Sequence, residues 1–234
     1  MFNERYLYLS LDLLSISLPF VYSFYSPAPF YKKWKHLWIA ILIPALFFIV
    51  WDEWFTQMGV WGFNPRYLTG IYIGSLPLEE VLFFICIPYA CVFTYHALNY
   101  LVKKDYVGPY QTKITWILVA ALVILGAIHY DKWYTAVTFF LLAAFLIILT
   151  VFIKPDYLGR FYFSYLFILI PFFIVNGILT GSFIEEQVVW YNPAEQIDFR
   201  MGTIPFEDTF YGMLLIVMNV SILEYLQKRK IPQA

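Results

Sequence analysis

The sequence predicts an all-α integral membrane protein with about seven transmembrane helices, built from two parallel-topology repeats of three helices joined by a linking helix. Composition, the lengths of the apolar runs and an internal repeat support this fold class. The 234 residues are 62% hydrophobic, 22% aromatic and only 13% charged, with a mean hydropathy of +0.69. A soluble domain has about 25% charged residues, so the composition favours lipid as the solvent.

Seven apolar runs are long enough to form helical spans. A span takes roughly 20 mostly apolar residues, and backbone groups in hydrocarbon need internal hydrogen-bond partners. The runs lack the period-two alternation of strands, so we expect helices. They cover residues 5–24, 36–56, 78–100, 114–129, 133–153, 160–180 and 206–226. We expect the clearest loops at SPAPFYKKWKH (26–36) and KKDYVGPYQTK (103–113).

The placement of Lys and Arg predicts the orientation, because cytoplasmic loops are enriched in both. With seven spans, one side receives four basic residues: Arg5, Arg66, Lys132 and Arg200. The other side receives eleven: Lys32, Lys33, Lys35, Lys103, Lys104, Lys113, Lys154, Arg160, Lys228, Arg229 and Lys230. We therefore expect a multi-pass protein of the cell (cytoplasmic) membrane, with its amino terminus outside and its carboxyl terminus in the cytoplasm.

An internal repeat relates the two halves of the chain. A shift of 128 residues aligns five features: Asn64-Pro65 with Asn192-Pro193, Gly74 with Gly202, Pro77 with Pro205, Glu79 with Glu207, and Glu80 with Asp208. A shift of 124 pairs Asp52 and Thr56 with Asn176 and Thr180. We expect residues 1–113 to hold the first repeat, and residues 114–234 the linking helix and the second repeat, within one membrane unit. Matching helices are four crossings apart, so both repeats run in the same direction.

Each repeat places two adjacent acids after a proline, in PLEE and in PFED. A proline at the first helical position and one acid behind it suit helix capping. Capping does not explain two acids in a row in both repeats. Both pairs should reach the same membrane face, where a pseudo-two-fold arrangement would bring them together. Carboxyl groups in an apolar site cannot all ionise, so one stays protonated and can donate its proton to an apolar substrate. A second carboxylate can take a proton back.

An alkene is an apolar substrate that needs a proton but no hydride, phosphate or metal. Protonation of a polyene end gives a carbocation, a second double bond closes a ring, and loss of a proton gives a neutral product. Aromatic faces stabilise cations, and the candidates for this role near the acids are Trp51, Trp54, Phe83 and Phe210. The same aromatic residues also suit a membrane interface.

The segments NPRYLTGIYIGSLPLEEVLFFICIPYACVFTY (64–95) and NPAEQIDFRMGTIPFEDTFYGMLLIVMNVSILEY (192–225) resemble the paired signatures of the flavin-independent lycopene cyclases. That family occurs as two small subunits or as a fused chain, and this chain resembles the fused form. The resemblance implies a lycopene β-cyclase, an isomerase or intramolecular lyase of carotenoid biosynthesis. Such an enzyme converts the linear ends of lycopene to β-rings, towards γ-carotene and β-carotene, without a consumed cofactor and without a metal.

The resemblance also assigns roles to residues and partners. It implies catalytic roles for Glu79, Glu80, Glu207 and Asp208, without distinguishing which of them donates the proton. It implies site-shaping roles for Asp52, Asn64, Asn176, Thr180 and Asn192. The expected partners are a lipid-soluble carotenoid, membrane lipid and other carotenoid-pathway enzymes, and we expect no nucleic acid.

Two other functions stay open. A proton-coupled transporter could use acid pairs and a parallel repeat, and Pro88 and Asn219 stand near the middles of their helices, where transporters break helices. A membrane prenyltransferase fold could act on another isoprenoid. Its clustered aspartates for magnesium have no equivalent here, since Asp52-x-x-x-Thr56 and Asn176-x-x-x-Thr180 occupy the corresponding places.

Overall fold

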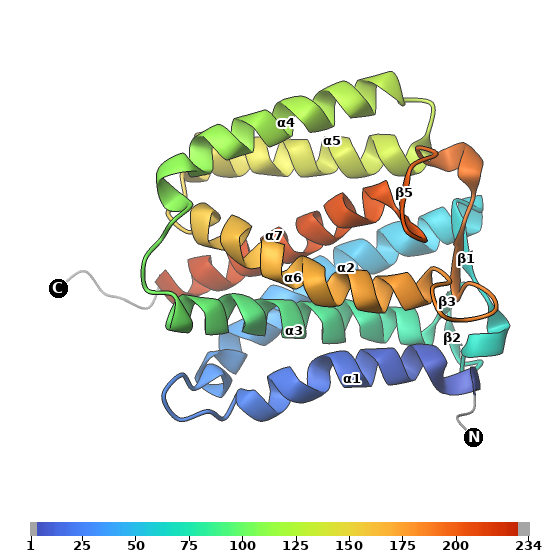
Figure 1. Cartoon of the computed structure of the whole chain (residues 1–234), viewed down its shortest axis with the longest axis horizontal. Coiled ribbons are helices and arrows are strands. Elements are labelled where there is room, and N and C mark those ends of the chain that lie inside the picture. Colours follow the sequence, from blue (N-terminus) through green and yellow to red (C-terminus); the bar gives the residue numbers. More distant parts are fainter. Residues whose placement is uncertain (1–3, 229–234) are drawn as a thin grey trace. The chain divides into compact units, whose positions relative to one another are not determined.

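The computed structural model describes residues 4–228, which form seven α-helices (Figure 1). These are α1 (Leu7–Tyr22), α2 (Trp34–Met58), α3 (Leu78–Leu101), α4 (Gln111–Ile128), α5 (Trp133–Ile148), α6 (Leu158–Leu179) and α7 (Phe206–Lys228). Each helix coincides with one of the seven predicted runs. The prediction of an all-α membrane protein is therefore confirmed.

Six helical segments of the described chain are long and apolar enough to cross a membrane. They are Phe30–Met58, Leu78–Leu101, Gly108–Ile128, Trp133–Ile153, Leu158–Leu179 and Phe206–Lys228. The helix α1 has 16 residues and is shorter than a full span. Large apolar side chains are exposed on several helices, for instance Leu14 at 68%, Leu46 at 67% and Leu166 at 63%. Such exposure suits contact with lipid, and the protein is a multi-pass membrane protein.

The two predicted loops end earlier than expected. In 26–36 a 3₁₀ turn, η2 (Phe30–Lys33), leads straight into α2. In 103–113 the turn η4 (Gly108–Tyr110) leads into α4 in the same way. Pro29 precedes the first turn and Pro109 lies at the start of the second. Because proline fixes a backbone angle that suits the start of a helix, each loop gives way to helix just after its proline.

Six short strands were not predicted: β1 (Trp61–Phe63), β2 (Tyr72–Ile73), β3 (Leu76–Pro77), β4 (Val189–Tyr191), β5 (Arg200–Met201) and β6 (Ile204–Pro205). The strands β2 and β3 form an antiparallel hairpin with Ile73 opposite Leu76, and β5 and β6 form the matching hairpin with Met201 opposite Ile204. Gly74 and Gly202 begin the two turns with φ of +66° and +69°. These angles favour glycine and explain why it recurs there.

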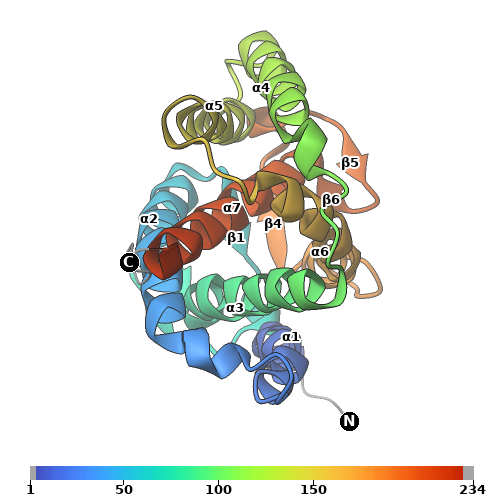
Figure 2. The same ribbon diagram turned by 90° about the vertical axis from the view of Figure 1, so that its left-hand side faces the viewer.

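The chain divides into two compact units, which are described separately. Of the described residues, the first unit contains 4–58, 63–101 and 215–228, and thus α1, α2, α3 and the last part of α7. Within it, α1 and α2 both pack along α3 (Figures 1 and 2). Its interior is aromatic: Phe30, Phe48, Phe55, Phe84 and Tyr89 are fully buried.

The second unit contains residues 59–62 and 102–214, and thus α4, α5, α6 and the first part of α7. Within it, α4 lies along α5 (Figure 2). The segment Gly59–Gly62 joins this unit because Val60 accepts a backbone hydrogen bond from Asn192 at 2.8 Å, just after β4. The sequence domains 1–113 and 114–234 stay a prediction.

Candidate active site

The first acid pair lies in the first turn of α3. Pro77 ends β3 and Leu78 begins the helix, so the β2–β3 hairpin delivers Glu79 and Glu80 directly to the helix start. Their side chains are buried, at 0% and 7% exposure. The Oε1 atom of Glu79 accepts a hydrogen bond from the backbone N–H of Thr69 at 2.6 Å. Glu79 therefore anchors the loop that precedes the hairpin.

The second acid of this pair contacts α1. The Tyr8 hydroxyl donates a hydrogen bond to Oε2 of Glu80 at 2.6 Å. Tyr8 is 1% exposed, and the ring of Phe83 lies edge-on to it with 6.3 Å between the ring centroids. Because α1 packs along α3, the first turn of α1 reaches the first turn of α3. The pair is thus held from two sides, by a loop and by a neighbouring helix.

The second acid pair repeats these contacts in the second unit. The Oε1 atom of Glu207 accepts a hydrogen bond from the backbone N–H of Ile197 at 2.7 Å, again ten residues upstream. It also accepts one from the Thr135 hydroxyl at 2.5 Å. The Tyr134 hydroxyl donates to Oδ1 of Asp208 at 2.5 Å. Glu207 and Asp208 are buried, at 0% and 5% exposure. Both repeats therefore hold their acids by the same contacts: a loop N–H binds the first acid, and a tyrosine hydroxyl of a neighbouring helix binds the second. We call this arrangement the acid frame.

Asp208 receives two more donors, both on its other oxygen. The side-chain amide of Asn176 donates to Oδ2 at 2.7 Å, and the Tyr191 hydroxyl donates to the same atom at 3.1 Å. The residue that matches Asn176 in the first repeat is Asp52, which is 3% exposed and interacts electrostatically with the α1 tyrosine. The first site thus carries an acid where the second carries an amide.

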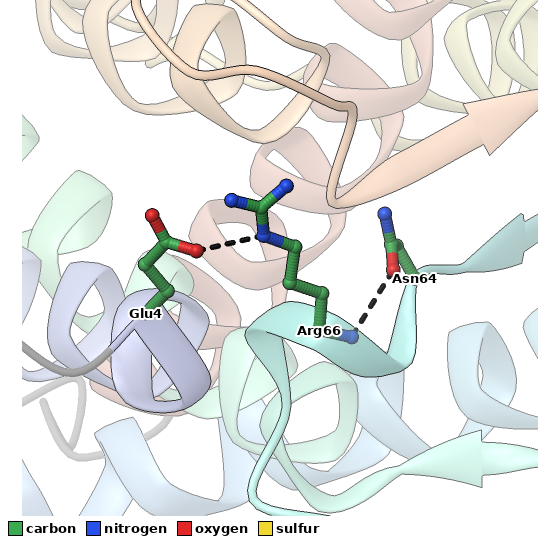
Figure 3. Close-up of polar contacts among 3 residues, drawn as sticks. All are labelled: Glu4, Asn64 and Arg66. Atoms are coloured by element: carbon green, nitrogen blue, oxygen red, sulfur yellow. Dashed lines mark hydrogen bonds and ion pairs between the residues drawn. The ribbon is translucent and has the colours of Figure 1, made fainter.

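Asn64 and Asn192 hold the loops that lead to the hairpins. Their side-chain oxygens accept hydrogen bonds from the backbone N–H of Arg66 at 3.1 Å and of Ala194 at 3.0 Å. These bonds cap two matching 3₁₀ turns, η3 (Pro65–Tyr67) and η6 (Pro193–Glu195). In the first repeat Arg66 also forms an ion pair with Glu4 at 2.7 Å, which ties this loop to the start of α1 (Figure 3).

Thr180 holds the turn of the second hairpin. Its hydroxyl contacts the backbone oxygen of Asn176 at 2.8 Å and the hydroxyl of Thr203 at 2.8 Å. The Thr203 hydroxyl also contacts Ser182 at 2.8 Å. This network links the end of α6, which carries Asn176, to the hairpin that delivers the acids. Thr180 therefore lies among the residues that position the second acid pair.

The four aromatic candidates lie in different surroundings. Trp51 is 5% exposed and packs against three phenylalanine rings of α2. Trp54 is 50% exposed and contacts one of the same rings. Phe83 contacts Tyr8, as described above, whereas Phe210 packs against two further phenylalanine rings. Phe83 thus has a ring contact with a tyrosine that binds an acid.

Several residues around the acids were not predicted. Tyr8 and Tyr134 stand 126 positions apart, so extending the repeat to the first and fifth helices would have found them. Around Asp208, the ring of Tyr134 lies 5.0 Å from that of Trp61, 5.7 Å from that of Tyr191 and 6.2 Å from that of Tyr211. Tyr211 is the residue that matches Phe83 by the shift of 128.

The arrangement suits the storage and transfer of protons. In both Glu79 and Glu207 the Oε2 atom is buried and has no hydrogen-bond partner among residues 4–228. In each of these residues Oε1 accepts the loop N–H, and Oε2 is left to interact with a substrate. Among the same residues, no group of three or more His, Cys, Asp or Glu side chains is placed to hold a metal ion.

The family model for lycopene cyclases matches residues 5–98 and 131–226. The chain belongs to the lycopene cyclase family. The two matched segments begin 126 residues apart, the separation of Tyr8 and Tyr134, so each contains one complete acid frame. The resemblance drawn from the paired signatures is confirmed.

The chain is also similar to the bifunctional lycopene cyclase/phytoene synthase of Phycomyces blakesleeanus. The two are 38% identical over 63 residues, which is 26% of this chain and 10% of the fungal protein. The match thus spans about a tenth of that relative's length. No solved structure matches the chain.

Proposed function

We propose that this lycopene cyclase family member closes the linear ends of lycopene to β-rings, by acid catalysis without net oxidation or reduction. It would act as an intramolecular lyase or isomerase in carotenoid biosynthesis. One observation carries the proposal. Both repeats hold two buried carboxyl groups, the first anchored to a loop N–H and the second bound to a tyrosine of a neighbouring helix.

The hydrogen bonds divide the roles within each pair. Glu79 and Glu207 each keep one oxygen that has no partner among residues 4–228, so we assign the donated proton to that oxygen. Asp208 accepts three hydrogen bonds over its two oxygens. Donors of this kind stabilise the ionised form. We therefore assign the proton donor to the first acid of each motif. The second acid is then the carboxylate that stabilises the cation and takes up the proton released after ring closure.

The proposed reaction balances within the substrate and these carboxyl groups. The O–H bond of the first acid breaks as a C–H bond forms at the terminal double bond, which leaves a carbocation. A second double bond attacks the cation and closes the six-membered ring. The adjacent C–H bond then breaks, its electrons form the ring double bond, and its proton passes to a carboxylate. The product is an isomer of the substrate, so no reductant is consumed.

The surroundings of the second pair support a cationic intermediate. The rings of Trp61, Tyr134, Tyr191 and Tyr211 lie together beside Asp208. Aromatic faces attract cations, and a carboxylate in a low-dielectric site stabilises positive charge more strongly than it would in water. The chemistry needs an apolar substrate that reaches the site through the bilayer, and a lipid-soluble carotenoid meets that need.

Pigment analysis in a host that accumulates lycopene tests the proposal. The wild type should yield cyclic carotene, and the double variant Glu79→Gln, Glu207→Gln should leave lycopene, with at least about a hundredfold lower rate, because a general acid contributes about 10²–10⁴-fold. Glutamine keeps an oxygen for the loop N–H, so the fold should persist. Glu4→Gln is the control, since it changes only an exposed ion pair.

Each alternative result has a definite meaning. A wild-type protein that is present in the membrane but leaves lycopene unchanged would contradict the proposal and favour a proton-coupled transporter or another isoprenoid substrate. If the double variant cyclises as fast as the wild type, Glu79 and Glu207 only anchor loops, and Glu80 and Asp208 become the donors.

Three further predictions accompany this proposal. We place the protein in the cell membrane with its amino terminus outside, on the basis of the four and eleven basic residues on the two sides. Two of those residues, Arg229 and Lys230, lie outside the described part of the chain. Association with other carotenoid-pathway enzymes also stays a prediction.

A further inference from the structure

A fifth buried acid lies beside the first pair. Asp12 stands on α1 four residues after Tyr8, so both side chains lie on the same face of the helix. Asp12 is 0% exposed. It interacts electrostatically with both Glu79 and Glu80, and also with Cys86 further along α3. The helix that supplies the tyrosine for Glu80 therefore also supplies a carboxyl group to the same site.

Neither carboxyl oxygen of Asp12 has a hydrogen-bond partner among residues 4–228. An ionised carboxylate that is buried without donors is very costly, whereas a neutral carboxyl is much less so. The nearby carboxyl groups of Glu79 and Glu80 add to the cost of a negative charge. Burial without donors therefore favours the neutral, protonated form of Asp12.

The second repeat differs at this place. The residue that matches Asp12 by the shift of 126 is Thr138, which is also 0% exposed and has a hydroxyl without a partner among residues 4–228. With Asp52 in place of Asn176, the first site gathers four carboxyl groups: Asp12, Asp52, Glu79 and Glu80. The second site gathers two, Glu207 and Asp208. The extra acids are confined to the first site.

We propose that Asp12 is the proton relay of the first acid pair, returning to Glu79 the proton that Glu80 collects. This inference rests on the proposed cyclisation. After ring closure the O–H bond of Glu80 breaks and its proton binds one oxygen of Asp12. The O–H bond on the other oxygen of Asp12 breaks in the same step, and that proton binds the Glu79 carboxylate. The cluster returns to its starting charge, and no external proton is consumed.

Asp12→Asn tests the relay, because an amide has the size of the carboxyl but does not pass a proton in this way. We expect the turnover rate in membranes supplied with lycopene to fall by about tenfold or more, within the range of proton-transfer effects, while KM stays unchanged. Lower pH should partly restore the rate, since bulk protons replace the relay, and the solvent deuterium isotope effect should increase. Asp12→Thr, which installs the residue of the second repeat, should retain more activity than Asp12→Asn.

Ser15→Ala is the matched control on the same helix. It removes a side-chain hydroxyl that bonds, within residues 4–228, to the backbone oxygen of Leu11 at 2.7 Å, so activity should stay at the wild-type level. An Asp12→Asn protein with the wild-type rate and pH profile would overturn the relay while leaving the cyclisation intact. An equal loss of turnover rate in Ser15→Ala, with no change in pH profile for either variant, would also overturn the relay. Such a result would mean that both substitutions act by disturbing the packing of α1. If the wild type forms no cyclic product, the cyclisation fails, and the relay with it.

Discussion

Replacing Tyr134 by phenylalanine tests the role assigned to Asp208. The substitution removes one oxygen atom, the donor of the 2.5 Å hydrogen bond to Oδ1 of Asp208. The two remaining donors, Asn176 and Tyr191, both bind Oδ2. Oδ1 is then left without a donor among residues 4–228. The ring contacts with Trp61 and Tyr191 need only the aromatic ring and should persist.

The size of the effect follows from the charge on the acceptor. A hydrogen bond to a charged group contributes about 1.5–3 kcal/mol, and about 1.4 kcal/mol corresponds to a tenfold change in rate. If the ionised Asp208 stabilises the carbocation, Tyr134→Phe should lower the cyclisation rate by about 10- to 150-fold. Tyr191→Phe should cost less, because its bond is longer, at 3.1 Å, and Asn176 still holds Oδ2.

The assay is the initial rate of cyclic carotene formation, measured by chromatography in membranes that contain equal amounts of each variant. Tyr162→Phe is the control. The Tyr162 hydroxyl forms a buried 2.6 Å hydrogen bond with the hydroxyl of Thr115. It lies fourteen residues before Asn176 on α6, which is about 21 Å along the helix. Its loss should cost about 1 kcal/mol of stability and leave the rate unchanged.

A wild-type rate for Tyr134→Phe would refute this role of Asp208, since the hydroxyl would then have no influence on its charge. An equal loss of activity in Tyr162→Phe would refute it too, because the loss would then reflect general destabilisation of the second unit.

Two matched pairs of substitutions exploit the repeat further. Asn176→Asp replaces the amide donor of the second site by the acid found in the first, and it should slow cyclisation about tenfold or more. Asp52→Asn makes the opposite change and should slow cyclisation less if Asp52 holds no essential proton. Chromatographic rates measure both variants, and equal losses would contradict a different protonation of the two sites. Gly202→Ala should lower the free energy of unfolding by about 1–2 kcal/mol, the cost of a left-handed backbone, because the added Cβ has no neighbour within 4 Å. Gly74→Ala should lower it further, because its Cβ would lie 2.9 Å from the Glu53 carboxylate, which accepts hydrogen bonds from the backbone N–H of Ser75 and would lose them on moving away. Thermal unfolding in detergent measures both variants, and a smaller loss for Gly74→Ala would refute this argument.

The helices could be predicted because lipid imposes their length and composition. A run predicted at 160–180 is the helix Leu158–Leu179, and one predicted at 206–226 is the helix Phe206–Lys228. The hairpins could not be predicted in the same way, because strands of two residues show no periodicity. Their signal was the glycine that recurs at 74 and 202, whose positive φ requires a turn.

The acid pairs could be predicted because the motif is local and occurs twice. The tyrosines could not be predicted from the motif, because Tyr8 and Glu80 are 72 residues apart and meet only through the packing of α1 on α3. Asp12 was missed for another reason. A single acid lowers the hydropathy of a long apolar run only slightly, and its burial becomes visible only when α1 lies against α3.

The two repeats share the acid frame but differ in the number of carboxyl groups around it. In each, a loop N–H binds the first acid and a tyrosine binds the second. A duplicated segment begins with identical chemistry in both copies, so the differences next to the acids indicate where the copies have taken separate roles. Asp12 and Asp52 add carboxyl groups to the first site, and such crowding favours bound protons.

The matching positions in the second site, Thr138 and Asn176, add no charge, and the amide of Asn176 donates a hydrogen bond that favours an ionised Asp208. Acid-catalysed ring closure needs both a mobile proton and a fixed negative charge that stabilises the cation. The first repeat holds more carboxyl groups, and the second holds a carboxyl group that accepts three hydrogen bonds. Loss of Glu79 should therefore impair protonation more than loss of Glu207, although the two residues occupy the same place in their frames.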